Sequence, residues 1–192
     1  FIVGNPRSGT TLVESILGSS DNITSAGELN ALTRIAPKSF QNITSEEILN
    51  IGNEYLRILD NFKKNIKNQF VIDKMPGNIF QVGLIKLCFP SSKIICLNRR
   101  PLDNAWSIFT QLYLGNIPYS SNLFNLGVAL SNVEALKKFW LSQNESKNFY
   151  VVDYEEIVND PYKHTRNIYD FVGVEGEYNE EKLRKLTIIK QR

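Results

Sequence analysis

Residues 1–13, FIVGNPRSGTTLV, join an apolar strand, a glycine-flanked loop and the apolar start of a helix. Gly4 and Gly9 stand five positions apart, and the hydroxyl residues Thr10 and Thr11 follow them. This spacing matches the phosphate-binding P-loop, G-x-x-x-x-G-K followed by Ser or Thr, except that Thr10 stands in place of the lysine. In nucleoside triphosphatases that lysine contacts the β- and γ-phosphates. The pattern therefore predicts an anion site that is not built for γ-phosphate transfer.

The loop keeps the means to bind an anion without that lysine. Successive backbone N–H groups and the positive end of a helix dipole converge on one point. Arg7 is the only cation of the loop, and its planar guanidinium can hold two oxygens of one phosphate or sulfate. The expected contacts of the anion are Arg7, Ser8, Gly9, Thr10 and Thr11.

The composition is that of an ordinary globular domain. The chain has 192 residues, of which 42% are hydrophobic, and its net charge is +2 from 22 basic and 20 acidic residues. Because basic and acidic residues nearly balance, the net charge gives no indication of nucleic-acid binding. No apolar run approaches the ~18 residues that a membrane span needs. No repeat or linker divides the sequence, so we expect one domain over 1–192.

The start of the chain and its cysteines bear on whether the sequence is a fragment and on the cellular compartment of the protein. The sequence begins inside a strand at Phe1 without an initiator methionine, which predicts a fragment of a longer protein, and no signal peptide is expected. Cys88 and Cys96 are too few for a disulfide framework, so we expect two buried thiols. A cytoplasmic location is the expectation that follows. Trp106 and Trp140 are expected in the core.

Apolar and helical patterns alternate along the chain. Strands are expected over 1–3, 70–72, 93–97 and 149–152, and helices over 11–17, 45–62, 76–87, 101–114, 123–141 and 162–172. Strands separated by helices pair in parallel through right-handed crossovers. The predicted fold class is therefore α/β, with a parallel sheet between two layers of helices.

Polar residues follow two of the predicted strands. Asp73 and Lys74 come after one, and Asn98, Arg99 and Arg100 come after the next. Open parallel sheets bind ligands beyond the carboxyl ends of their strands. Two interpretations are open: Asp73 binds magnesium in a P-loop small-molecule kinase, or Lys74 stabilises a transferred group without a metal.

A second phosphate site is indicated by Arg99 and Ser107. They stand eight residues apart, and a helix that begins with Pro101 places Ser107 two turns in, so both can reach one phosphate. Together with the loop over 6–11, this arrangement resembles sulfotransferases that use 3′-phosphoadenosine 5′-phosphosulfate (PAPS). The resemblance continues through 73–76, 89–95 and 153–161.

The resemblance implies roles for these residues. In that family, which has a P-loop-like fold, the loop holds the 5′-phosphosulfate, and an arginine and a serine corresponding to Arg99 and Ser107 hold the 3′-phosphate. Tyr154 corresponds in position to a family tyrosine that contacts the nucleotide. Lys74 and Arg7 would neutralise charge on the leaving oxygen. No metal is required by this chemistry.

The general base is implied by a second resemblance. The segment over 26–29, AGEL, resembles the Gly-Glu of tyrosylprotein sulfotransferases and of bacterial sulfotransferases with tetratricopeptide repeats. Glu28 is then the base, a role that suits a carboxylate if partial burial raises its pKa from about 4.3 toward neutrality. Cytosolic sulfotransferases of phenols and steroids use a histidine instead. The only histidine, His164, lies in a late helical pattern and is expected to be a packing or surface residue.

The acceptor implied is a hydroxyl of a peptide, a sugar or a small molecule, attacked in line at sulfur. The tyrosylprotein branch has arginines after its Gly-Glu that recognise acidic acceptors, whereas this chain has Ala31 and then Arg34. The family also continues into a segment that closes over the nucleotide, where this chain offers Lys190 and Arg192. The closing segment is expected to be either missing from the sequence or shortened, and an N-terminal repeat domain is a candidate part of the full-length protein. A non-catalytic nucleotide-binding module is the remaining alternative.

Overall fold

The computed structural model describes residues 1–63, 70–113, 117–143 and 146–174. Its strands form one parallel arrangement. They are β1 (Ile2–Gly4), β2 (Ile23–Ser25), β3 (Phe70–Ile72), β4 (Ile94–Asn98) and β5 (Phe149–Asp153). β4 pairs with both β1 and β5, and β2 pairs with β3. A parallel bridge between Ile2 and Lys74 joins the two parts, which gives the order β2-β3-β1-β4-β5.

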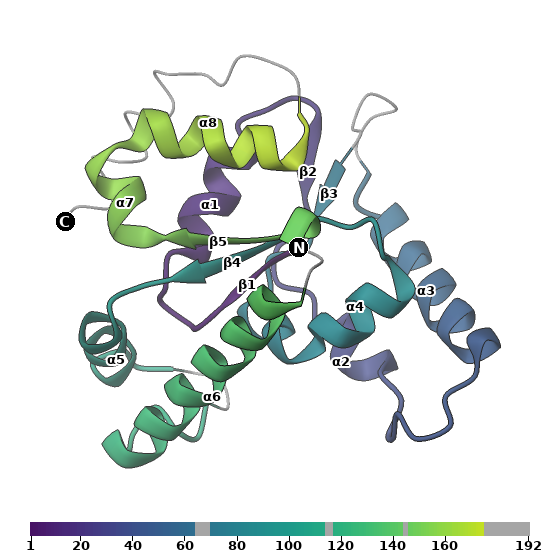
Figure 1. Ribbon diagram of the computed structural model, residues 1–192, viewed down its shortest axis with the longest axis horizontal. Coiled ribbons are helices and arrows are strands. Elements are labelled where there is room, and N and C mark those ends of the chain that lie inside the picture. The colour runs from purple at the N-terminus through teal and green to yellow at the C-terminus, as the bar shows by residue number, and fades with distance from the viewer. Residues whose placement is uncertain (64–69, 114–116, 144–145, 175–192) are drawn as a thin grey trace.

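Helices cover both faces of this arrangement (Figure 1). One face carries α1 (Thr10–Leu17), α7 (Tyr154–Asn159) and α8 (Pro161–Val172). The other carries α2 (Ala31–Ile35), α3 (Ser45–Asp60), the 3-10 helix η1 (Pro76–Gln81), α4 (Val82–Cys88) and α6 (Leu123–Ser142). The remaining described helices are α5 (Pro101–Phe109), which packs against α6, and the short η2 (Ser146–Asn148).

The strand β4 shows why there are two layers of helices. Its successive side chains point to opposite faces, so Ile95 and Leu97 join the core under α1 and α8. Ile94 and Cys96 join the core under η1, α4 and α6. All four residues are buried. The expected α/β fold with a parallel sheet between helices is confirmed.

The elements differ from the expected ones mainly where local patterns are short. β2, α2 and α7 were not expected, because segments of three to six residues are too short to show a period. The helix expected over 76–87 starts as 3-10 over Pro76–Gln81, and its α-helical part begins at Val82. The helix expected over 101–114 ends at Phe109, with Thr110 as its cap.

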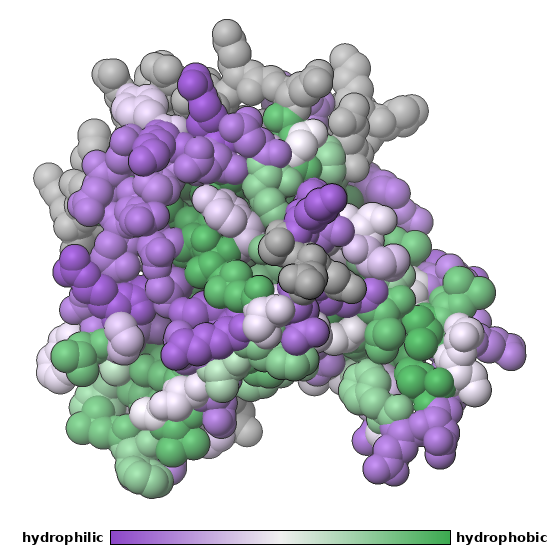
Figure 2. All heavy atoms as spheres, in the orientation of Figure 1, coloured by the Kyte–Doolittle hydropathy of each residue, from purple (hydrophilic) through white to green (hydrophobic). Residues whose placement is uncertain are grey.

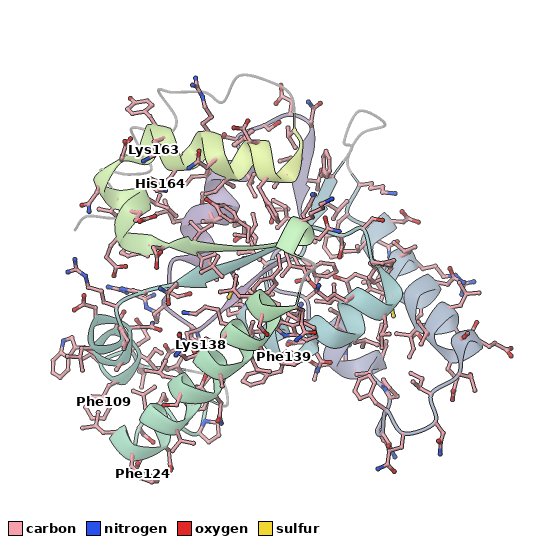
Figure 3. All side chains as sticks on the ribbon, in the orientation of Figure 1. Phe109, Phe124, Lys138, Phe139, Lys163 and His164 are labelled. Atoms are coloured by element: carbon pink, nitrogen blue, oxygen red, sulfur yellow. The ribbon has the colours of Figure 1, made fainter. Side chains whose placement is uncertain are left out.

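The exposure of the two tryptophans corrects one expectation about the core. Trp106 is 67% exposed, so its expected burial is wrong. It belongs to an apolar surface over α5 and the start of α6 that also includes Leu102, Phe109 and Phe124 (Figures 2 and 3). Trp140 does pack against the core, with Nζ of Lys86 5.5 Å from its ring centre.

The remaining expectations concern the cysteines and the membrane. Both cysteines are free thiols, and burial raises the pKa of Cys96 to about 12. Cys88 is half-buried. Within the described parts of the chain, no helix has the length and apolar character to cross a membrane.

Candidate functional site

The phosphate-binding loop joins β1 to α1 at the carboxyl edge of the sheet. Gly9 precedes the helix with a φ of 104°, in the region that favours glycine. A Cβ on Gly9 would lie 2.6 Å from Cδ2 of Tyr154, so only glycine lets the loop pass this close to the ring. Thr10 then begins α1, whose first N–H groups have no partner within the helix.

The loop is held in shape from its outer side. Nδ2 of Asn104, on α5, donates a hydrogen bond to the carbonyl of Pro6 over 2.8 Å. The Ser8 hydroxyl donates to the carbonyl of Asn5 over 2.7 Å, and Ser8 is fully buried. Arg7 has a φ of 63°, which is strained for a side chain of its size. The hydroxyl of Ser8, a predicted contact, is thus used in a hydrogen bond within the loop.

Arg99 brings the end of β4 against this loop. Its Nη1 donates to the carbonyl of Arg7 over 2.8 Å, and its guanidinium carbon lies 4.9 Å from the centre of the Tyr154 ring. Nε of Arg7 in turn donates to the Ser107 hydroxyl over 3.3 Å. Nε of Arg99 is buried and has no hydrogen-bond partner among the described residues. The structure therefore brings together four of the predicted residues and leaves one guanidinium donor unused.

Lys74 reaches the site from the end of β3. Its backbone N–H donates to the carbonyl of Gly27 over 2.9 Å, and its Nζ donates to Oε1 of Glu28. Oε2 of Glu14, on α1, lies 3.6 Å from the same nitrogen. The Lys74 side chain is 7% exposed, whereas that of Glu28 is 58% exposed. The predicted pair is present, but Glu28 does not meet the condition of partial burial that a carboxylate base was expected to meet.

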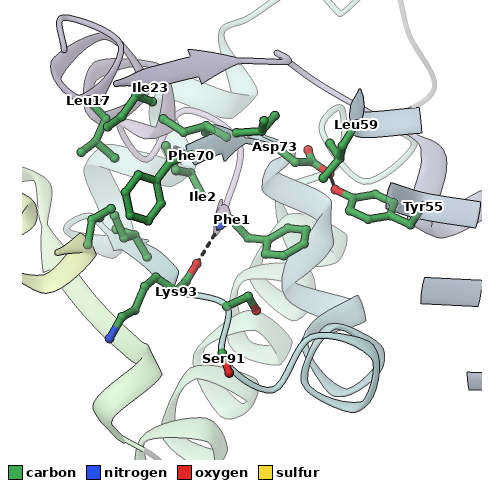
Figure 4. A pocket seen from close by; sticks show the side chains of 15 residues that line it. Phe1, Ile2, Leu17, Ile23, Tyr55, Leu59, Phe70, Asp73, Ser91 and Lys93 are labelled. Atoms are coloured by element: carbon green, nitrogen blue, oxygen red, sulfur yellow. Dashed lines mark hydrogen bonds between the residues drawn. The ribbon is translucent and has the colours of Figure 1, made fainter. Parts of the chain in front are cut away.

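Asp73 faces away from Lys74 despite being its neighbour. Its Oδ2 accepts hydrogen bonds from the Tyr55 hydroxyl over 2.6 Å and from Nδ2 of Asn78 over 3.0 Å. Burial raises the pKa of Asp73, and it also raises the pKa of Tyr55. Figure 4 shows both side chains in a small cavity of about 240 Å³, which is lined mainly by apolar residues from the amino ends of the strands. The interpretation of Asp73 as a magnesium ligand beside the loop is not supported by this position.

A larger cavity of about 1020 Å³ opens beside the loop. Seven of the predicted site residues line it, namely Arg7, Gly9, Thr10, Thr11, Glu28, Arg99 and Tyr154. Lys74 and Ser107 contact lining residues instead, through Glu28 and Arg7 respectively.

No individual role was predicted for the residues on the other side of this cavity. It is formed by Met75, Leu112, Tyr113, Ile117 and Tyr119. Burial raises the pKa of Tyr113 and of Tyr119, and the Tyr113 hydroxyl has no hydrogen-bond partner among the described residues. Tyr113, at the end of the helix expected over 101–114, and Tyr119, in the loop after it, were the available signal, but the sequence does not show which way either side chain points.

The single histidine of the sequence is not among the residues that line the cavity. His164 is on α8, where Nδ1 lies 3.6 Å from Oε2 of Glu156 and 13% of the side chain is exposed (Figure 3). The expectation of a packing residue is consistent with this position. Lys190 and Arg192 lie outside the described residues.

Comparison with known families gives a match over most of the chain. Residues 1–180 match the sequence profile of the sulfotransferase family. A protein of Aquifex aeolicus (strain VF5), described as an uncharacterized protein, is 32% identical over 195 residues. That alignment covers 92% of this chain and 26% of the relative, so the chain spans about a quarter of the length of the curated relative it matches.

Solved structures show the same fold. The sulfotransferase domain from the Synechococcus PCC 7002 olefin synthase has a TM-score of 0.66 at 20% identity, over 95% of this chain and 74% of that one. The sulfotransferase from Alicyclobacillus acidocaldarius has a TM-score of 0.65 at 19% identity, over 98% and 89%. Mouse sulfotransferase SULT7A1, complexed with PAP, has a TM-score of 0.54 at 16% identity, over 98% and 62%.

Proposed function

The chain belongs to the sulfotransferase family, and from that premise we propose that it transfers a sulfuryl group from PAPS to an acceptor hydroxyl. One observation carries the proposal. The loop lacks the P-loop lysine, yet Arg99, Arg7 and Ser107 form a connected group at its edge and Lys74 approaches from the neighbouring strand. A donor with two separate anionic groups suits such an arrangement better than a nucleoside triphosphate.

The donor is bound by two groups of residues. Backbone N–H groups of the loop, with the Thr10 and Thr11 hydroxyls, hold the 5′-phosphosulfate at the helix N-terminus. Arg99 and Ser107, which both contact Arg7, hold the 3′-phosphate. Tyr154, beneath the Arg99 guanidinium, borders the nucleotide. The complex of the mouse neighbour with PAP supports a nucleotide of this kind.

The reaction is an in-line displacement at sulfur. The acceptor oxygen forms a new bond to sulfur while the bond from sulfur to the phosphate oxygen breaks, and adenosine 3′,5′-bisphosphate (PAP) leaves. Glu28 takes the proton of the acceptor hydroxyl. Lys74 and Arg7 neutralise the charge that develops on the leaving oxygen. Because Lys74 and Glu28 are paired in the free protein, the substrates must separate them before transfer.

The acceptor side of the cavity favours an apolar or phenolic molecule. Met75, Leu112, Tyr113 and Tyr119 line it, and its only charged lining residue outside the loop and Arg99 is Glu28, within the described ranges. Arg34, the candidate for recognising an acidic acceptor, is exposed on α2 and is not among the lining residues. Acidic peptides therefore have less support than phenols, aromatic alcohols or a tyrosine without acidic neighbours.

The test is transfer of labelled sulfate from PAPS to a panel of phenolic, sugar and peptide hydroxyls, measured with the full-length protein and a metal chelator. Transfer to any member supports the proposal. Phosphorylation from ATP that requires magnesium would instead establish the kinase alternative. Tight binding of PAP with no transfer to any acceptor would establish the non-catalytic module, and would overturn the proposal.

A further inference from the structure

Lys74 has two carboxylate partners, of which only Glu28 has a role in the proposed reaction. Glu14 is the second, with its Oε2 3.6 Å from Nζ of Lys74. The two carboxylates differ in their surroundings. The side chain of Glu28 is 58% exposed, while that of Glu14 is 16% exposed. The more buried partner is therefore the one to which no step has been assigned.

Glu14 is fixed from three directions. Its backbone lies in α1, whose neighbouring residues Leu12, Val13 and Ile16 are buried in the core. The Ser25 hydroxyl, at the end of β2, donates to Oε1 of Glu14 over 2.5 Å. This bond occupies one carboxylate oxygen and leaves the other for Lys74. The side chain is thus held between the helix of the phosphate loop and the strand that leads to Glu28.

The proposed reaction changes the charge of Glu28 but requires that of Lys74 to persist. When Glu28 accepts the acceptor's proton it becomes neutral, and its attraction for the ammonium is lost. Without Glu14, an ammonium that is 7% exposed would then have no protein carboxylate beside it, and a buried charge that lacks such a partner is unfavourable. Glu14 is the carboxylate that remains beside it.

We propose that Glu14 is a positioning residue that holds the Lys74 ammonium in place, and keeps it charged, while Glu28 is released to act as the base. Ser25 orients Glu14 for this task. An ammonium has three N–H donors, so Lys74 can face Glu14 and the leaving oxygen at the same time once Glu28 is released. Glu14 exchanges no proton and touches neither substrate. This inference rests on the proposed sulfuryl transfer.

The test compares Glu14→Gln with Glu14→Asp in the full-length protein. Glutamine keeps the shape of Glu14 and an oxygen for Ser25 but has no charge, whereas aspartate keeps the charge and is one methylene shorter. If Glu14 holds Lys74 electrostatically, Glu14→Gln lowers kcat for transfer by roughly 10- to 100-fold, and Glu14→Asp recovers part of that loss. A packing role predicts the opposite order, with Glu14→Gln the more active variant.

Two further measurements separate this role from a structural one. The Kd of PAP should stay within about twofold of the wild-type value in Glu14→Gln, because Glu14 does not line the cavity. In a Lys74→Ala background, adding Glu14→Gln should change the single-turnover rate by less than about twofold, since the two residues act as a unit. Glu46→Gln, the same change at an exposed position of α3, is the matched control.

The outcomes distinguish the inference from the function on which it rests. If the wild type transfers sulfate and Glu14→Gln is equally active, or loses as much in the Lys74→Ala background as alone, the role of Glu14 is refuted and the function stands. If the wild type transfers no sulfate, both fail together.

Discussion

Arg99 donates a hydrogen bond to the backbone carbonyl of Arg7 over 2.8 Å, although 92 positions separate them in sequence. This contact fixes the end of β4 against the phosphate loop and stacks the guanidinium over Tyr154. The side chain of Arg99 and the backbone of Arg7, which carry two of the three cations of the proposed donor site, are thereby held together. Nε of Arg99 is buried and has no hydrogen-bond partner among the described residues.

Replacing Arg99 by alanine should weaken the nucleotide mainly through its 3′-phosphate. Removing a charged hydrogen bond costs about 1.5–3 kcal/mol, so the Kd of PAP should rise roughly 10- to 100-fold. The Kd of adenosine 5′-phosphate, which lacks that group, should change much less. Calorimetry with both ligands measures the difference. Arg100→Ala is the control, because the Arg100 side chain is exposed and does not line the cavity; equal losses for the two ligands would place Arg99 elsewhere.

Glu28→Gln should abolish most of the transfer without preventing donor binding. A general base contributes roughly 10²- to 10⁴-fold to a rate, and glutamine cannot take the proton. Since the Glu28 side chain is 58% exposed, the substitution should leave the folded state intact. The comparison is kcat against the Kd of PAP, with Glu46→Gln as control. Near-normal turnover in Glu28→Gln would assign the base to another group.

Gly9→Ala should be more damaging than Gly27→Ala. Both glycines have a positive φ, of 104° and 71°, which costs roughly 1–2 kcal/mol for a residue with a Cβ. Only at Gly9 would the new Cβ also clash, at 2.6 Å from Cδ2 of Tyr154, whereas nothing lies within 4 Å at Gly27. Urea denaturation compares the two. If Tyr154→Ala fails to recover part of the loss in Gly9→Ala, the clash is not its cause.

Asp73 should make stability fall as pH rises. Burial raises its pKa above the ordinary value of 3.8, so above that pH the folded state retains a proton that the unfolded state has lost. The contribution is full below pH 3.8 and is lost as the pH passes through the raised pKa. The free energy of unfolding of the wild type minus that of Asp73→Asn should therefore decrease as the pH rises above 3.8. A difference that increases with pH would mean that the bonds from Tyr55 and Asn78 outweigh burial.

The sequence was sufficient to predict the parts of the fold that follow from local residue patterns. Short apolar segments alternating with helical patterns determined the parallel sheet and its layers, because parallel strands require long crossovers. The loop pattern and the polar residues after the strands likewise indicated one edge of the sheet as the site. That edge is where Arg7, Thr10, Glu28 and Arg99 line a cavity. β2 escaped prediction because its three residues gain stability from pairing with β3 and not from a local pattern.

Only the tertiary structure decided what each polar side chain faces. Asp73 and Lys74 are adjacent and chemically plausible in one site, but alternation along an extended chain sends Asp73 to Tyr55 and Lys74 to Glu28 and Glu14. Glu14 carries no sign of its role in the sequence, where it is a single acidic residue in an apolar helix. Its significance arises from α1, β2 and β3 meeting at one point. Sequence order fixes which groups are available, whereas packing between distant elements fixes which charges compensate one another.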